Sequence, residues 1–242
     1  MDITASLLYD TRPRFPLPQD LVPAIQPAKR LEMLPSPLIN LMKGQTTKDE
    51  HLINIASSIA DLAGMAAVIE AGYATKGQAL WSDEVYIGLR INPIAHRLLD
   101  KSGQKAAMGG SALLSEALRL AALIWIIWIK RRCRSYPGTP LSYVSKLLTL
   151  LSTDYAWRNA SSASDLVSIR LWLLVLCGIS SSGVTEERTI AANLIAGEML
   201  QSKGDSWTEV MLRVRQMPWI SDFEAPCTEL EKIVRATNIT SW

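Results

Sequence analysis

Apolar residues recur every three or four positions along most of the chain, which is the spacing of one face of an α-helix. The clearest series follows residue 50 and consists of Leu52, Ile55, Ile59, Leu62, Ala66 and Ile69. No stretch alternates with the period of two that marks a half-buried strand, and no Asn-Gly or Asp-Gly hairpin turn is present. The pattern therefore predicts an all-α protein, an irregular bundle of about seven or eight helices.

Capping signals indicate where several of these helices begin and end. Thr47 and Glu50 have the spacing of a capping box, and Gly72 can adopt the left-handed conformation that ends a helix. Ser82 is expected to cap the next helix, which Pro93 kinks or divides. Later helices are expected to start at residues suited to a cap or a first turn: Ser111, Thr139, Thr185, Ser206 and Pro226.

The first 44 residues differ from the rest of the chain, because they contain seven of its twelve prolines. Proline fixes φ and lacks a backbone donor, so this segment suits neither a regular helix nor a central strand. We expect a proline-rich extended arm over residues 1–44, followed by a single helical domain over residues 45–242.

Two runs of apolar residues raise the question of a membrane span. Leu120–Ile129 is ten residues long and Leu171–Ile179 is nine, whereas a spanning helix needs about 20. We therefore expect two buried core helices and no membrane association. The N-terminus lacks the charged leader and apolar core of a signal peptide, so a nuclear or cytoplasmic location is expected.

Composition narrows the functional classes. The formal net charge is only +2, and the three cysteines and two histidines are scattered, so neither a DNA-binding surface nor a metal site is indicated. No nucleotide-binding, hydrolase or metalloprotease motif is present. We expect no cofactor. The basic residues Lys130, Arg131, Arg132 and Arg134 suit either the end of a helix or a phosphate-binding or nuclear-localisation patch, with the helix end favoured.

Candidate chemistry is limited to a few residues. Glu116 and Arg119 lie three positions apart near the start of a very apolar helix, where they form either a structural ion pair or part of a ligand pocket. His96 has no partner placed by the sequence. If the protein is an enzyme, the expected catalytic residues are Glu116, Arg119, His96 and Asp222.

Four tryptophans lie in or beside apolar helices and are candidates to line a ligand pocket: Trp125, Trp128, Trp172 and Trp219. Aromatic side chains dominate both protein cores and the pockets between bundle helices, so the sequence leaves both roles open.

The order of motifs from His96 to Glu224 resembles the regulatory region of fungal-specific transcription factors. Three segments carry the resemblance: EALRLAALIWI with Glu116 and Arg119, LWLLVLCGI with Trp172 and Gly178, and SWTEV with Trp207. The resemblance implies an all-helical regulatory domain associated with metabolic gene clusters. Members of the family bind DNA through an N-terminal zinc cluster held by six cysteines, which this chain lacks.

Two hypotheses of function follow. In the first, the chain is a stand-alone regulatory or effector-binding domain of secondary metabolism that binds a small apolar molecule or a protein partner, without direct sequence-specific DNA binding. In the second, it is a repurposed, cofactor-independent biosynthetic enzyme, a cyclase or isomerase with an aromatic-lined pocket.

Overall fold

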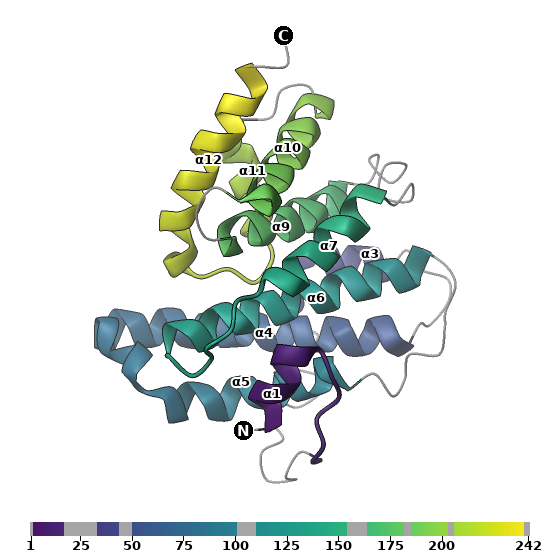
Figure 1. Ribbon diagram of the computed structural model, residues 1–242. Coiled ribbons are helices and arrows are strands. Elements are labelled where there is room, and N and C mark those ends of the chain that lie inside the picture. Colours follow the sequence, from purple (N-terminus) through teal and green to yellow (C-terminus); the bar gives the residue numbers. More distant parts are fainter. Residues whose placement is uncertain are drawn as a thin grey trace. The chain divides into compact units, whose positions relative to one another are not determined.

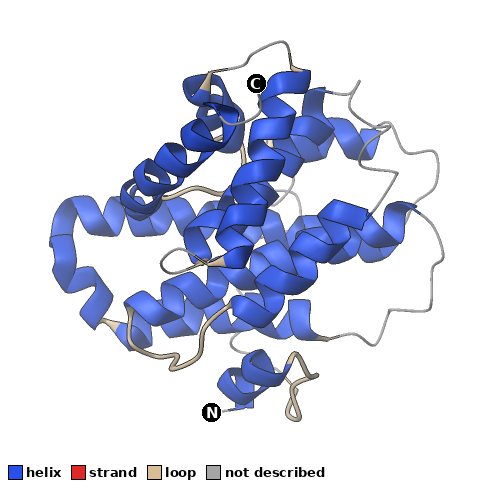
Figure 2. Cartoon of the chain, turned by 45° about the horizontal axis from the view of Figure 1, so that its top comes forward, coloured by secondary structure: helices blue, strands red, loops and turns tan. Residues whose placement is uncertain are grey.

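The computed structural model describes residues 2–16, 33–43, 50–100, 110–153, 164–181, 185–202 and 206–239. All regular structure in these ranges is helical, and they contain no strand (Figure 2). The prediction of an all-α protein is therefore confirmed. The described residues form ten α-helices and two short 3-10 helices, more than the sequence pattern predicts.

One compact unit consists of Met1–Leu34 and Thr47–Thr139. Its described helices are α1 (Asp2–Tyr9), α4 (Glu50–Lys76), η2 (Gly77–Ser82), α5 (Glu84–Leu99) and α6 (Gly110–Arg132). Helix α6 packs against α4 and α5, and α1 packs against α5 (Figure 1). Every residue of α6 from Ala117 to Ile127 is buried, so α6 is the central helix of this unit.

The second compact unit consists of Pro35–Thr46 and Pro140–Trp242. Its described helices are α3 (Ser36–Lys43), α7 (Leu141–Thr153), α9 (Ser164–Ser180), α10 (Glu186–Gln201), α11 (Trp207–Val214), η3 (Ser221–Phe223) and α12 (Glu224–Ile239). Helix α9 contacts all five of the other α-helices. All its residues from Val167 to Ser180 are buried. A methyl group at Gly178 would lie 2.6 Å from Leu230 Cδ2, so glycine allows α12 to approach α9 closely.

The prediction that residues 1–44 form an extended arm is wrong at two places, because the structure describes the helices α1 and α3 there. Helix α1 precedes the first proline, and Pro37 lies at the start of α3, where its missing N–H costs no hydrogen bond. Of the other six prolines in this segment, Pro18, Pro23 and Pro27 lie outside the described residues. Residues Pro35–Thr46 belong to the same compact unit as Pro140–Trp242, so the boundary between the two units does not coincide with the predicted end of the arm. The single domain over residues 45–242 stays a prediction.

Two of the predicted helix starts are confirmed. Ser206 and Glu209 form a reciprocal capping box at α11, and Thr185 caps α10 by accepting a hydrogen bond from the backbone of Arg188. At α5 the cap is Asp83 rather than Ser82, because Ser82 is the last residue of η2. Thr47 lies outside the described residues.

The predicted helix end at Gly72 is wrong, as is the division of a helix at Pro93, and a kink at Pro93 stays a prediction. Gly72 lies inside α4, which continues to Lys76 and is followed by Gly77 with a φ of +54°. The left-handed residue is therefore the later glycine. Pro93 lies within α5 and does not divide it.

The structure changes the argument about membrane spans. By length and composition alone, Glu50–Ser82 and Ala112–Arg132 are each apolar and long enough to cross a membrane. In the most apolar 18-residue stretch of each segment, most residues are buried inside the protein, as in the core helices of soluble proteins. Burial, rather than the length of the apolar run, is therefore the observation that favours core helices here.

Candidate functional site

The start of α6 places a charged side chain among apolar residues. Arg119 is one of the largest fully buried side chains, with an exposed fraction of 1%, and its neighbours on the helix, Leu118 and Leu120, belong to the core. A buried guanidinium is costly unless anions and hydrogen-bond acceptors surround it. The partners of Arg119 therefore decide what this site can do.

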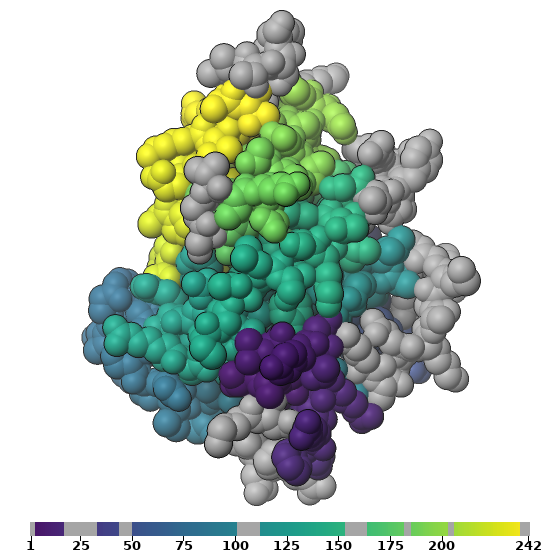
Figure 3. All heavy atoms as spheres, viewed as in Figure 1, coloured from purple at the N-terminus to yellow at the C-terminus, as the bar shows by residue number. Residues whose placement is uncertain are grey.

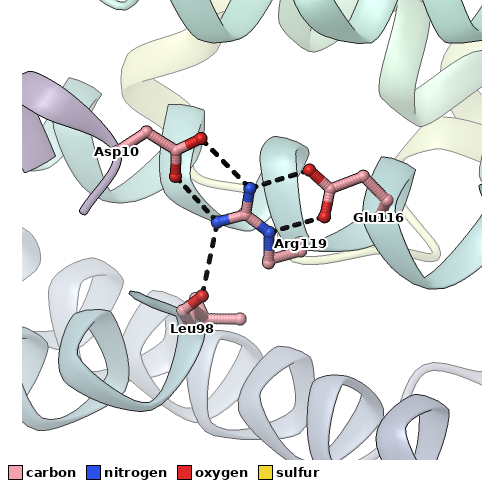
Figure 4. A network of polar contacts seen from close by, with 4 residues as sticks. All are labelled: Asp10, Leu98, Glu116 and Arg119. Atoms are coloured by element: carbon pink, nitrogen blue, oxygen red, sulfur yellow. Dashed lines mark hydrogen bonds and ion pairs between the residues drawn. The ribbon is translucent and has the colours of Figure 1, made fainter. Parts of the chain in front are cut away.

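Five hydrogen bonds surround the Arg119 guanidinium (Figure 4). On one side, Nε donates to Glu116 Oε2 at 2.7 Å and Nη2 donates to Glu116 Oε1 at 2.8 Å. On the other side, Nη1 and Nη2 donate to the two Asp10 carboxylate oxygens at 3.0 and 3.4 Å. Nη1 also donates to the Leu98 carbonyl at 3.4 Å, which is one of the orphan acceptors at the end of α5.

This arrangement uses the whole hydrogen-bonding capacity of Arg119. A guanidinium has five N–H donors, and the two bidentate carboxylates and the carbonyl together accept five hydrogen bonds. Burial lowers the pKa of Arg119, but the hydrogen bonds and charges of Glu116 and Asp10 outweigh it, so the pKa lies above its ordinary value. The site stabilises a permanently charged guanidinium. Because all five N–H donors of Arg119 are used, none is left to bind a ligand.

Asp10 is the member of this site that sequence reasoning missed. Its φ is +50°, and Thr11 N donates to Ser6 O at 3.0 Å, so Asp10 ends α1 in the left-handed conformation that aspartate tolerates. The same turn directs its carboxylate towards Arg119 (Figure 4). The two residues are 109 positions apart, and no local pattern marks Asp10 as the partner.

The residues after Asp10 make two further polar contacts with α5 and its end. Arg12 Nε lies 3.1 Å from Asp100 Oδ1, and His96 Nε2 lies 2.9 Å from the Phe15 carbonyl oxygen. With Asp10, these contacts form what we call the N-terminal anchor, comprising Asp10, Arg12 and Phe15 on one side and Arg119, Asp100 and His96 on the other. Figure 3 shows α1 and the residues that follow it, in purple, on the surface of the protein.

The structure brings three of the four candidate catalytic residues into the N-terminal anchor and its ion-pair network. Glu116, Arg119 and His96 all contact residues that hold positions 10–15 in place. Asp222 belongs to the other unit, where it lies in η3. The geometry agrees with the structural ion pair that the sequence left open, and extends it with Asp10.

The four candidate tryptophans divide between the units. Trp125 and Trp128 are in α6, where Trp125 is fully buried and Trp128 is partly exposed. Trp172 in α9 is fully buried, and its Nε1 donates to the Pro218 carbonyl at 3.2 Å.

The adjacent Trp219 is partly buried. Its Nε1 donates to Glu224 Oε1 at 2.9 Å, and its ring packs edge-to-face with Phe223 at a centroid distance of 5.0 Å. Trp172 and Trp219 therefore contribute to the packing between α9 and the segment before α12.

A second buried ion pair, which the sequence analysis did not identify, lies between α9 and α10. Arg170 Nη1 is 3.0 Å from Glu198 Oε1, and both side chains are at least nine-tenths buried. Burial raises the pKa of Glu198 and the Arg170 charge lowers it, with burial the larger effect. Here desolvation outweighs the attraction between the charges, the reverse of the outcome at Arg119.

The described residues give no support to metal or thiolate chemistry. Among them, no group of three or more His, Cys, Asp or Glu residues is placed to hold a metal ion. All three cysteines are buried and free of disulfides. Burial raises the thiol pKa of Cys133 to about 11 and that of Cys227 to about 12, so neither forms a thiolate readily near pH 7.

The comparisons with known proteins add no family assignment. No protein-family model matches this chain, and no curated protein or solved structure is significantly similar to it. The resemblance to fungal transcription factor regulatory regions therefore rests on the three sequence motifs alone.

Proposed function

We propose that this chain is a non-catalytic regulatory domain of secondary metabolism that binds a small apolar molecule or a protein partner in the nucleus or cytoplasm. The proposal does not include direct, sequence-specific DNA binding or insertion into a membrane. The observation that supports it most is the state of Arg119, all of whose donors are used by acceptors of the protein itself. A catalytic group needs to reach the reacting atoms of a substrate.

The positions of the three motifs are consistent with this proposal. Motif residues Leu120, Leu123 and Trp125 lie in the core of the first unit, and Trp172 and Gly178 lie in the core of the second. Ser206 of the third motif caps α11. In this proposal the motifs specify a helical scaffold, and the ligand or partner is recognised by side chains on that scaffold. Trp125, Trp128, Trp172 and Trp219 stay the candidates for lining an apolar ligand site.

The enzyme hypothesis has weaker support. Glu116 already binds Arg119, and His96 already contacts the Phe15 carbonyl. A substrate would therefore have to displace contacts that hold residues 10–15 in place. Leaving Arg119 without its acceptors in a buried site is costly.

The test is to mix the purified chain with a panel of apolar metabolites and measure both the melting temperature and the chemical identity of each compound after incubation. The proposal predicts that a bound compound raises the melting temperature and is recovered unchanged. Conversion of a compound by the wild-type chain, abolished in Glu116→Gln with little change in melting temperature, would establish the enzyme hypothesis instead.

DNA binding is measured separately, by fluorescence anisotropy with a library of duplexes at physiological salt. Only weak binding, with no preference among sequences and a steep salt dependence, is expected of a chain with a net charge of +2. Tight binding that selects particular sequences would contradict the proposal.

A further inference from the structure

Helix α5 presents two apolar side chains to solvent near its start. Val85 is 69% exposed and Leu89 is 51% exposed, and Val85 has the largest exposed fraction among the large aliphatic side chains that the structure describes. The two residues are four positions apart, so they lie one turn from each other on the same face of the helix. Scattered exposed apolar residues are common, so the meaning of this pair depends on what surrounds it.

The position of the pair on α5 places it between two neighbouring helices. Successive residues of an α-helix are about 100° apart around its axis, so residues of α5 follow one another around it in the order Asn92, Val85, Leu89, Tyr86 and Arg90. At the first end of this series, Asn92 accepts a hydrogen bond from Lys130 of α6 at 2.9 Å. Towards the other end, Lys76 in the last turn of α4 lies 5.1 Å from the centroid of the Tyr86 ring. The exposed pair therefore lies between an edge formed by α6 and an edge formed by the end of α4.

Both edges carry positive charge. On the α4 side, the Arg90 guanidinium lies 3.8 Å from the centroid of the Tyr86 ring. On the α6 side, the Arg132 guanidinium lies 5.5 Å from the Trp81 ring of η2, at the end of the unit where α6 ends beside η2 and the start of α5 (Figure 1). Contacts with aromatic rings keep these cations close to apolar surface. The exposed cations of the two edges are Lys76, Arg90, Arg131, Arg132 and Arg134.

The neighbouring acidic residues neutralise only part of this charge. Asp83 lies 3.5 Å from Lys76, and the exposed Glu84 is close enough to the end of α6 to act on Cys133. Within the described part of the chain, the side chains of Arg131 and Arg134 have no partner. Five cations less two carboxylates leave three positive charges here, whereas the whole chain has a formal net charge of +2.

An apolar strip between two cationic edges is complementary to a helix that has apolar residues on one face and carboxylates on both flanks. We propose that this surface, which consists of Val85, Leu89 and the five cations and which we call the α5 surface, docks an acidic amphipathic helix of a partner protein. Apolar side chains one turn apart on the partner pack on Val85 and Leu89, and its carboxylates pair with the cations. The inference rests on the protein-partner form of the proposed function and names the chemistry of that partner.

The same residues favour a protein over a nucleic acid or a membrane. A phosphate backbone gains little from an apolar strip at the centre of its footprint, and the carboxylates of Asp83 and Glu84 repel it. The Tyr86 ring beside the strip already carries Lys76 and Arg90, so it is not open to a stacking base. Two apolar side chains are also a small face compared with that of a helix that binds a membrane surface.

The test selects helical peptides on the full-length chain from a displayed library in which the charge of the peptides is not fixed. Each peptide has about 18 residues, or about five turns of helix, with apolar residues on one face and either glutamate or lysine at every flanking position. The proposal predicts that the selected peptides have glutamate at most flanking positions. Fluorescence anisotropy then measures their affinity, which should fall about threefold or more between about 50 and about 300 mM salt.

Matched variants locate the binding site on the protein. Val85→Ser with Leu89→Ser should weaken binding of the selected peptides about tenfold or more, because both side chains lose apolar surface that docking buries. Arg90→Glu with Arg131→Glu, which reverses one charge at each edge, should weaken binding by about tenfold and select lysine-rich peptides from the library. All four residues are exposed, so the melting temperatures of both variants should stay within about 2 °C of the wild type.

The control variant changes the same kinds of residue in the other unit. Leu212 is 59% exposed and the Lys232 side chain is 67% exposed, so Leu212→Ser with Lys232→Glu removes comparable apolar surface and reverses a comparable charge. This variant should bind the selected peptides as the wild type does. An equal loss of affinity in the control and in the Val85 and Leu89 variant would show that the peptides do not recognise the α5 surface, and would overturn the proposal.

Three other outcomes would also overturn it. The first is a selection that enriches no peptide, or enriches lysine-rich peptides, on the wild-type chain. The second is a set of glutamate-rich peptides whose affinity is unchanged by Val85→Ser with Leu89→Ser. The third is binding of duplex DNA, or of phosphatidylcholine vesicles containing phosphatidylserine, that Arg90→Glu with Arg131→Glu abolishes while no acidic peptide is selected. The metabolite test of the proposed function uses neither peptides nor these variants, so the two proposals fail separately.

Discussion

The two units contain comparable central helices that stabilise a buried arginine in different ways. In α6, Arg119 is surrounded by two carboxylates and a carbonyl. In α9, Arg170 pairs with the carboxylate of Glu198 on the next helix. The charges outweigh burial at Arg119, whose pKa is raised, while burial outweighs the charge at Glu198, whose pKa is also raised.

The comparison predicts that burying an ion pair does not by itself stabilise a helical unit. The raised pKa of an arginine means that folding favours its charged form, whereas the raised pKa of a glutamate means that folding disfavours its charged form. We therefore infer that the Arg119 network makes a net contribution to stability and that the Arg170–Glu198 pair does not.

The largest expected effect is the loss of Arg119. Arg119→Met should lower the free energy of unfolding by about 3–5 kcal/mol, because it leaves the Asp10 and Glu116 carboxylates facing each other without a cation. Urea denaturation followed by circular dichroism measures this change. Arg119→Lys is the control, since it keeps the charge but not the bidentate geometry. Its free energy of unfolding should lie between those of the wild type and Arg119→Met. An Arg119→Met protein as stable as the wild type would show that the network is not net stabilising.

The second prediction concerns the pair in the other unit. Replacing it by apolar residues of similar size, as Arg170→Met with Glu198→Leu, should leave the free energy of unfolding unchanged or raise it by about 1–4 kcal/mol, since both desolvation costs are removed. Arg170→Met alone is the control and should be destabilising, because Glu198 then loses its partner. A double variant less stable than this single variant would contradict the distinction between the two units.

A smaller effect is expected at Glu116. Glu116→Gln should lower the free energy of unfolding by about 1 kcal/mol, because Arg119 keeps Asp10 and the Leu98 carbonyl, and Glu116 is partly exposed. The same denaturation experiment measures this change in free energy, and the backbone amides of residues 3–16 should stay protected from hydrogen exchange. A loss as large as that of Arg119→Met would mean that Glu116 rather than Asp10 is the main partner.

The smallest effect is a pH dependence at Glu198. Because its folded-state pKa is raised, the stability that it contributes is fully present below the unfolded pKa of about 4.5 and is lost as the pH rises through the folded-state pKa. Subtracting the unfolding free energy of Glu198→Gln from that of the wild type should therefore give a difference that falls with rising pH. A difference that rises over the same range would mean that Arg170 outweighs burial.

The parts of this molecule that could be predicted from sequence are the parts that local rules determine. The periodicity of Leu52 to Ile69 predicted α4, and the Ser206–Glu209 spacing predicted the cap of α11. Glu116 and Arg119 could be paired because they are three residues apart on one helix.

The missed features depend on tertiary contacts. Asp10 reaches Arg119 across 109 residues of chain, and Glu198 meets Arg170 only because α10 packs on α9. The helices at both ends of residues 1–44 were missed because the prediction used the proline content of the whole segment rather than the position of each proline. Helix α1 contains no proline. Composition is therefore a poor guide to a segment whose prolines are unevenly placed.

The central claim is that Arg119 holds the N-terminal segment through Asp10 rather than serving a substrate. A double-mutant cycle with Asp10→Asn and Arg119→Met measures it most directly. If the claim is right, the coupling free energy between the two residues is about 1–3 kcal/mol, and either single variant exposes residues 10–16 to hydrogen exchange. A coupling within about 0.3 kcal/mol of zero, with residues 10–16 protected as in the wild type, would contradict it.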